Sequence, residues 1–273
     1  MAAAGIFPKV AGDIVYQDDY NLLQSTIASV VSTYYNNSLS SVQLTGNPII
    51  TAAQLDNLRL DISKGYKHIT GSNPAITDVS PGDLILAATW NSYKTFADYC
   101  VTNKDTIYPS QRTQTSASSD SLTSAWNGSH SFTTRFTFAS SVQAEAYFNT
   151  QSRLRITVGG SNSLGSSKDN GWLSLLNAVG VQYYNNANWD AGGTITIVNQ
   201  YGSNYYAENF CSISATKVSG TILDITVTIN DADVGDPFVD ENVNTDASAI
   251  IVFDHSYDAI TVVLPTVSVT SNW

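Results

Sequence analysis

Charged residues are scarce in this chain of 273 residues, and basic residues are the scarcer kind. Asp, Glu, Lys and Arg make up 13% of the sequence, with 12 basic side chains against 23 acidic ones and a formal net charge of −11. A nucleic-acid partner would require clustered Lys and Arg to neutralise phosphates, so the composition argues against nucleic-acid binding. The segment 201–273 holds ten acidic residues and one basic residue, and an anionic surface would repel it.

Residues that build common catalytic and metal sites are also few. We expect the two cysteines, Cys100 and Cys211, to be small buried residues, because nothing marks them as a disulfide or a metal pair. His68, His130 and His255 show none of the spacings of helix-built zinc sites. No nucleophile elbow or phosphate-binding loop motif occurs. The sequence therefore predicts a protein that is not an enzyme and that uses no metal or cofactor.

Long apolar runs are missing as well. No window approaches the roughly 20 apolar residues that cross a bilayer, so we expect no membrane insertion. The N-terminal segment lacks the basic start and apolar stretch of a secretory signal. We therefore expect a chain that is made as a soluble cytoplasmic protein.

Helical periodicity marks the first third of the chain, although no long exact internal repeat is present. Asp18 or Asp19 is suited to cap a first helix, and Thr51 a second. Ser80, followed by proline, predicts the start of a third helix that runs toward Lys104. All three are apolar on more than one side, which favours packing against neighbours over a lone amphipathic surface. The apolar face of the first two helices includes Leu23, Ile27, Val31, Leu55, Leu58 and Ile62.

The period changes toward 2 beyond a Ser-, Thr- and Gln-rich stretch at 110–131, which we interpret as a linker. Short helices are predicted at 140–150 and 169–180, where Trp172 is expected to be a core residue, and the remaining segments alternate like strands. Pro265 confines the last strand to an edge or a break. The chain is thus predicted to be α+β, with an N-terminal helical region followed by a mainly antiparallel β-sandwich-like domain that carries short helical insertions. The predicted domains are 1–110 and 111–273.

Two features are candidates for ligand binding. The segment 230–246 begins like a calcium loop but lacks the glycine and glutamate of an EF-hand, so a looser cation site and a solvated hairpin loop both stay open. Aromatic side chains in the second domain either stack on sugars or fill core and interfaces. The candidate glycan contacts are Tyr183, Tyr184, Tyr205 and Tyr206.

Five segments resemble, in the same order, blocks found in structural proteins from the virions of tailed bacteriophages, especially cyanophage-like ones. They include AGDIVYQDDYNLLQ, ITAAQLDNLRLDI with a following HITG, and FTFASSVQAEAYFNTQSRLRITV, then DNGWLSLLNAVG and NDADVGDPFVDENV. Gln151 and Ser152 stand where such proteins usually have Gly-Gly, and Leu55 stands where they often have Trp. The segment 81–110 matches less well.

The resemblance implies a structural virion component of the tail, baseplate or neck, with no catalytic residues. Its partners would be other virion proteins and copies of itself, joined through the N-terminal helices, with the β-domain exposed. We expect the assembly contacts at Leu23, Ile27, Val31, Leu55, Leu58 and Ile62. Three alternatives stay open: a carbohydrate-binding fibre or adsorption protein that contacts a host surface glycan, a capsid decoration protein, and a hydrolase of host envelope polymers.

Overall fold

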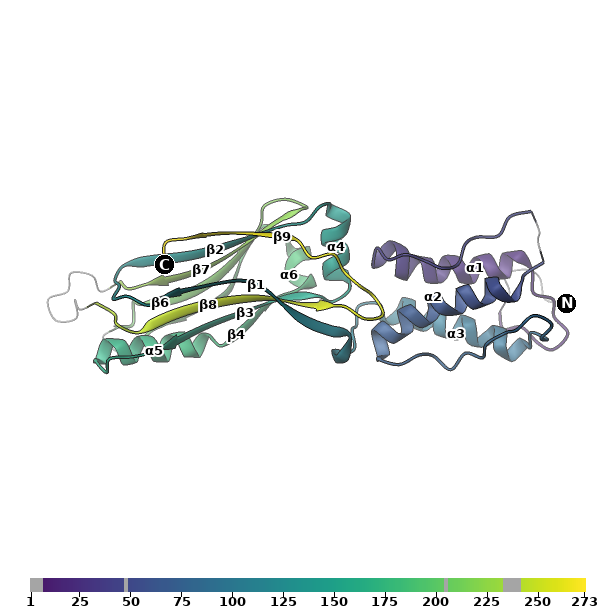
Figure 1. Cartoon of the computed structure of the whole chain (residues 1–273), viewed down its shortest axis with the longest axis horizontal. Helices are drawn as coiled ribbons and strands as arrows, with labels where there is room; N and C mark the ends of the chain where they lie inside the picture. Colours follow the sequence, from purple (N-terminus) through teal and green to yellow (C-terminus); the bar gives the residue numbers. More distant parts are fainter. Residues whose placement is uncertain (1–6, 47–48, 204–205, 233–241) are drawn as a thin grey trace. The chain divides into compact units, whose positions relative to one another are not determined.

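Three helices account for the apolar periodicity of the first third of the chain. They are α1 (Gln17–Ala28), which continues as the π-helical η1 (Ser29–Tyr34), α2 (Ala52–Thr70) and α3 (Ala87–Asn103). Thr51 caps α2 as predicted, because its hydroxyl accepts a hydrogen bond from the Gln54 amide. The helices pack side by side, and Figure 1 shows their first turns at the same end.

Two of the helix starts differ from the prediction. α1 begins after Tyr16, and Asp19 accepts a hydrogen bond from the Tyr16 amide at 2.7 Å from within the first turn. α3 begins at Ala87 rather than at Ser80. The intervening Gly82 has a φ of +94°, in the left-handed region that interrupts a helix, so this segment forms a turn.

Strands and short helices form the rest of the chain. The strands are β1 (Arg112–Leu122), β2 (Ser129–Thr137), β3 (Arg153–Ser161), β4 (Val181–Tyr184), β5 (Thr194–Tyr201), β6 (Phe210–Lys217), β7 (Ile222–Asn230), β8 (Asp246–Ser256) and β9 (Thr266–Ser271). The 3₁₀ turn η2 (Pro109–Gln111) precedes them. Helices α4 (Ser141–Asn149) and α5 (Ser167–Val179) lie where the sequence predicts them, and α6 (Asn186–Ala191) was not predicted.

The strands build two antiparallel sheets, in the orders β1-β8-β3-β4 and β5-β6-β7-β2-β9. This arrangement, with N-terminal helices ahead of the sheets, confirms the predicted α+β class. β9 follows Pro265 and lies at a sheet edge, as expected for a strand beside a proline. The described part of the chain contains no helix long and apolar enough to cross a membrane.

The stretch that we interpreted as a linker is instead strand β1 and the start of β2. β1 lies at the edge of the four-stranded sheet, and Leu122 is its one buried residue. An edge strand with so little buried surface needs few apolar side chains. The hydrophobic alternation that reveals a strand is therefore missing from its sequence.

Aromatic contacts join the inner faces of the two sheets. Phe136 of β2 meets Phe253 of β8 edge to face, with ring centroids 5.6 Å apart. Trp172 of α5 is 1% exposed and packs edge-on against Trp126 at 4.7 Å. The expectation that Trp172 is a core residue is confirmed.

The computed structural model of the protein describes residues 7–46, 49–203, 206–232 and 242–273, and the chain divides into two compact units. Unit 1 contains Met1–Thr113 with two short later segments, Asn149–Gln151 and Ser256–Val262. Unit 2 contains Gln114–Phe148, Ser152–His255 and Val263–Trp273. The two predicted domains, 1–110 and 111–273, are each one continuous segment. The sequence pattern did not indicate that residues 256–262 return to unit 1.

Candidate functional site

The six residues predicted as assembly contacts lie inside unit 1. One hydrophobic core contains them all, each at most 1% exposed: Leu23, Ile27, Val31, Leu55, Leu58 and Ile62. A side chain without exposed surface cannot contact another subunit unless its own unit unfolds. This prediction is therefore corrected: the apolar face holds the three helices together, and an assembly surface has to lie elsewhere on the unit.

The three helices are copies of one structural repeat. They start at Gln17, Ala52 and Ala87, so consecutive starts are 35 residues apart. The core follows the same spacing in three buried sets, which are Tyr20, Leu55 and Trp90, then Leu23, Leu58 and Tyr93, then Ile27, Ile62 and Ala97. We call residues 9–43, 44–78 and 79–113 repeats 1, 2 and 3.

Side-chain amides lock the repeats together. In repeat 1, the Asn21 amide donates to the Leu44 carbonyl at 3.0 Å and accepts from the Leu44 N–H at 2.8 Å. In repeat 3, Asn91 makes the same pair of bonds to Lys9, at 2.9 and 2.8 Å. The two asparagines occupy equivalent positions, and so do the two backbone residues that they hold. Because repeat 1 holds repeat 2 and repeat 3 holds repeat 1, the repeats join cyclically.

The joint between repeats 2 and 3 differs: the Tyr93 hydroxyl donates to the Leu55 carbonyl at 3.4 Å, and an ion-pair cluster within repeat 2 lies at the asparagine position. Asp56 stands at the asparagine position, and Arg59 pairs with Asp56 at 2.7 Å and with Asp78 at 2.9 Å. Asp78 directly precedes the backbone position that an asparagine holds in the other two joints. An open groove of about 390 Å³ lies here, bordered by the first turn of α2 and the segment 79–85.

A glycine in α2 lies at the closely packed centre of unit 1. A Cβ atom on Gly65 would lie 3.2 Å from Cys100 Sγ and 3.3 Å from Ile27 Cδ1. Burial raises the pKa of the Cys100 thiol to about 12, so this cysteine is a protonated packing residue. Cys211 is also buried and unpaired, which confirms the expectation for both cysteines.

A tight turn precedes the helix in repeats 1 and 3. Asp13 donates its amide to the Val10 carbonyl at 3.0 Å and accepts from the Val10 amide at 2.9 Å. Asp83 makes the same two bonds with Ser80, at 3.0 and 2.7 Å. The glycine before each aspartate has a φ of +93° or +94°, which favours glycine over any other residue. The equivalent residues of repeat 2, 47–48, lie outside the described residues.

Each repeat exposes one large aliphatic side chain directly after this position. Ile14 is 49% exposed, Ile49 is 90% exposed and Leu84 is 83% exposed, and the three are 35 residues apart. The residue that follows each of them is partly buried against the core. Each of them precedes a helix start by three residues, and Figure 1 shows the first turns of the three helices at one end of unit 1. We call Ile14, Ile49 and Leu84 the apolar triad.

Acidic residues outnumber basic ones in the segments that carry the apolar triad. Segments 9–20, 44–59 and 78–90 hold six carboxylates and two cations. One cation, Lys9, is buried in an ion pair with Asp19 at 2.9 Å. The other is Arg59, which two carboxylates share. This end of unit 1 therefore presents apolar side chains in a negative setting.

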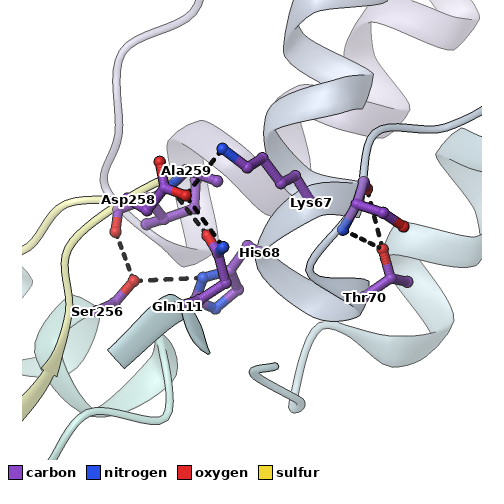
Figure 2. A network of polar contacts seen from close by, with 9 residues as sticks. Lys67, His68, Thr70, Gln111, Ser256, Asp258 and Ala259 are labelled. Carbon is purple, nitrogen blue, oxygen red and sulfur yellow. Dashed lines mark hydrogen bonds and ion pairs between the residues drawn. The ribbon is translucent and has the colours of Figure 1, made fainter. Parts of the chain in front are cut away.

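A polar network ties the C-terminal end of α2 to the returning segment 256–262 (Figure 2). Lys67 pairs with Asp258 at 2.8 Å. Gln111 donates to the same carboxylate at 3.1 Å and accepts from the Ala259 amide at 3.1 Å. These contacts hold a late segment of the chain against an early helix.

A buried serine–histidine pair lies in the same network. His68 Nδ1 is 3.3 Å from Ser256 Oγ, and the Ser256 hydroxyl donates to the Ile260 carbonyl. Burial, followed by the charge of Arg112, lowers the pKa of His68 to about 4, so the imidazole is neutral at neutral pH. Nucleophilic serine needs both a base and an approaching substrate. Both side chains are buried, so this pair anchors the segment and does not face a substrate.

Most of the acidic segment 230–246 lies outside the described residues. Asp231 is described: it is buried and forms an ion pair with Lys168 at 2.7 Å. Asp169 accepts a hydrogen bond from the Asn244 amide at 2.6 Å. Within the described ranges, no group of three or more potential ligands could hold a metal ion.

The four tyrosines predicted as glycan contacts do not share one surface. Tyr183 and Tyr184 are adjacent on β4, and neighbouring residues of a strand point to opposite faces. Tyr184 is 1% exposed, which corrects its assignment as a surface contact. Tyr183 is partly exposed, with the Arg153 guanidinium 3.8 Å from its ring centroid. Tyr206 is half-buried, and residue 205 lies outside the described residues.

A groove elsewhere on unit 2 does present an aromatic side chain. It has a volume of about 280 Å³ and lies between α5 and the end of β5. Ser174, Gln200 and Ser203 line it together with Tyr201, which is 52% exposed. An open aromatic ring among amide and hydroxyl groups is suited to bind a neutral polar ligand.

The chain matches no protein-family model, no curated protein and no solved structure. No relative therefore assigns a role to the residues described above. Their geometry and the resemblance of the sequence segments are what a functional proposal has to rest on.

The repeat is the feature that our sequence analysis missed. Its signal is present: Gly-Asp recurs at 12–13 and 82–83, and an aromatic residue followed by asparagine recurs at 20–21 and 90–91. The middle copy hides the period, because it has Leu55 and Asp56 at the second pair of positions. The three copies keep the same buried positions but not the same residue types, and a search for exact repeats does not detect such a similarity.

Proposed function

We propose that this chain is a structural component of a bacteriophage virion, of the tail, baseplate or neck. It joins the particle in multiple copies through unit 1 and has no catalytic role. Its partners are other virion proteins and copies of itself.

The apolar triad is the observation that carries this proposal. A body whose core is closed by three interlocked repeats has no need to expose Ile14, Ile49 and Leu84 for its own stability. Aliphatic side chains that are kept in solvent at equivalent positions are typical of a surface that a partner covers. The resemblance to virion proteins includes two of the three turn-and-helix segments that build this body.

Immunogold electron microscopy of purified particles tests the proposal. The particles are those of the phage that encodes the chain, and the antibody is raised against the full chain. We expect gold at the tail, baseplate or neck, and quantitative mass spectrometry of the same particles should find several copies per particle. Gold over the capsid would favour the decoration role instead. Antigen that stays in the lysate and never co-purifies with particles would contradict a virion role.

The groove beside Tyr201 favours a second candidate function, which is binding of a host surface glycan by unit 2. Stacking of a sugar face on Tyr201 with hydrogen bonds to Gln200 and Ser203 would be the binding mode. This role is compatible with a place in the virion, since attachment proteins do both.

A glycan array with the full chain tests this second function. Tyr201→Ala should abolish any binding that the wild-type chain shows, whereas Tyr183→Ala should keep it, because Tyr183 lies outside the groove. Loss of binding through Tyr183→Ala alone would return the site to the surface of β4. An array without any bound glycan would remove the attachment role.

A further inference from the structure

The apolar triad has an arrangement that constrains its partner. Its members lie at one position of three repeats, 35 residues apart, and the repeats are linked cyclically by hydrogen bonds of Asn21, Asn91 and Tyr93. A cyclic set of three similar units approximates three-fold symmetry within a single chain. The chemistry of the triad is nearly uniform, because it consists of two isoleucines and one leucine.

The direction of the helices places the triad on one end. Near the helix starts, the Tyr20 hydroxyl donates to the Gln54 carbonyl at 3.2 Å and the Tyr93 hydroxyl donates to the Leu55 carbonyl at 3.4 Å. Further along, the Cβ position of Gly65 lies against Ile27 and Cys100. Early residues thus meet early residues and late ones meet late ones, so the three helices run in the same direction.

We propose that this end of unit 1 docks on the three-fold axis of a homotrimeric partner, with one copy of this chain on each axis. Each member of the triad would enter one of three identical aliphatic pockets on the partner. The inference rests on the proposed function, because the partner would be a neighbouring protein of the particle.

Symmetry and charge both favour a homotrimeric partner. Three identical subunits around an axis offer the same pocket three times, and only a ligand with matching three-fold positions can fill all of them. Three modest contacts then act together, since the second and third form within one complex. Lys9 and Asp19 are buried together, so five carboxylates and one cation, Arg59, remain in the surrounding segments, and this negative balance favours basic side chains around the pockets. A second copy of this chain would present the same negative charge and would be repelled.

Site-specific photocross-linking tests the proposal on assembled particles. Three variants of the full chain each carry a photoreactive phenylalanine, at position 14, 49 or 84. We expect all three to cross-link to the same peptide of one partner protein, because the three pockets are identical. A matched variant with the same group at Val42, which is 67% exposed in unit 1, should not cross-link to that peptide.

Three results would overturn the proposal. They are cross-links to different peptides from the three positions, cross-links to a second copy of this chain, and no cross-link from any of them. The proposed function survives each of these results if the chain is still found in particles. Absence of the wild-type chain from particles would instead reject the proposed function itself.

Substitutions give a quantitative check. Ile49→Ser and Leu84→Ser should each lower affinity for the partner about tenfold, the loss expected when one aliphatic side chain is not buried. Ile14→Ser should lower it less, since Ile14 is less exposed. Val42→Ser should leave incorporation unchanged. Equal loss through Val42→Ser would show a general effect on folding and would contradict docking through the triad.

Discussion

His68 shows how a single buried residue couples the helical unit to pH. Its imidazole is buried beside Ser256, and its pKa is lowered from 6.5 to about 4 by burial and by Arg112. Between pH 6.5 and about 4, His68 therefore binds a proton in the unfolded chain but not in the folded chain. The stabilising effect of a neutral His68 is complete above pH 6.5 and is lost as the pH falls toward 4.

We predict that the free energy of unfolding of unit 1 falls by up to about 3 kcal/mol between pH 6.5 and 4 because of this residue. His68→Gln should remove most of that pH dependence, whatever its effect on stability at neutral pH. His130→Gln, at a half-buried position of β2 in unit 2, is the matched control and should keep this pH dependence. Urea unfolding followed by fluorescence at several pH values measures the slope. An unchanged slope in His68→Gln would show that another group is responsible.

The asparagine locks decide how the elements of unit 1 are connected. Asn21 and Asn91 each satisfy both backbone groups of one residue that lies outside the helices and strands, so neither residue needs a neighbouring strand. In each case the asparagine side chain makes the two backbone hydrogen bonds that a neighbouring strand would otherwise make. The π-helical η1 continues α1 with a wider turn.

We predict that Asn21→Ala and Asn91→Ala each destabilise the chain by roughly 1–3 kcal/mol, because each leaves a backbone N–H and C=O without their partners. Asn57→Ala is the control, since Asn57 lies one residue past the equivalent position on α2. Its effect should stay within about 0.5 kcal/mol. Chemical denaturation of the full-length variants measures all three. A large effect for one asparagine alone would contradict the equivalence of the repeats.

At the scale of the whole molecule, unit 1 is completed by chain from far along the sequence. Ile260 is 0% exposed and belongs to the core of the three helices. The Asn37 side chain donates to the Thr261 carbonyl at 3.0 Å, and Lys67 holds Asp258. The helical unit therefore depends on residues synthesised after most of unit 2.

We predict that Ile260→Ala destabilises unit 1 by about 2–4 kcal/mol, as expected for a large-to-small change in a closed core. Val263→Ala, at a residue that is 61% exposed, should have little effect. Thermal unfolding of the full chain, followed by circular dichroism at the helical signal, measures both. An equal and small effect of the two substitutions would show that the returning segment does not support the helices.

Local patterns in the sequence determined much of this protein. The Thr51 cap, the helices at Ser141–Asn149 and Ser167–Val179, the alternating strands and the burial of Trp172 all follow from spacing and residue type. The acidic balance is likewise a property of composition. These features depend on neighbours within a few residues, which is the range that a sequence pattern reports.

Only the tertiary structure decided which apolar residues are exposed to solvent. Leu58 and Ile49 look alike in the sequence, but one is buried by partners from other repeats and the other is 90% exposed. Tyr184 is buried for the same reason, and β1 was missed because an edge strand buries too little to leave a pattern. The asparagine locks and the return of Ile260 join residues that are far apart in the chain. A sequence shows that a residue needs a partner, and the fold determines which partner it finds.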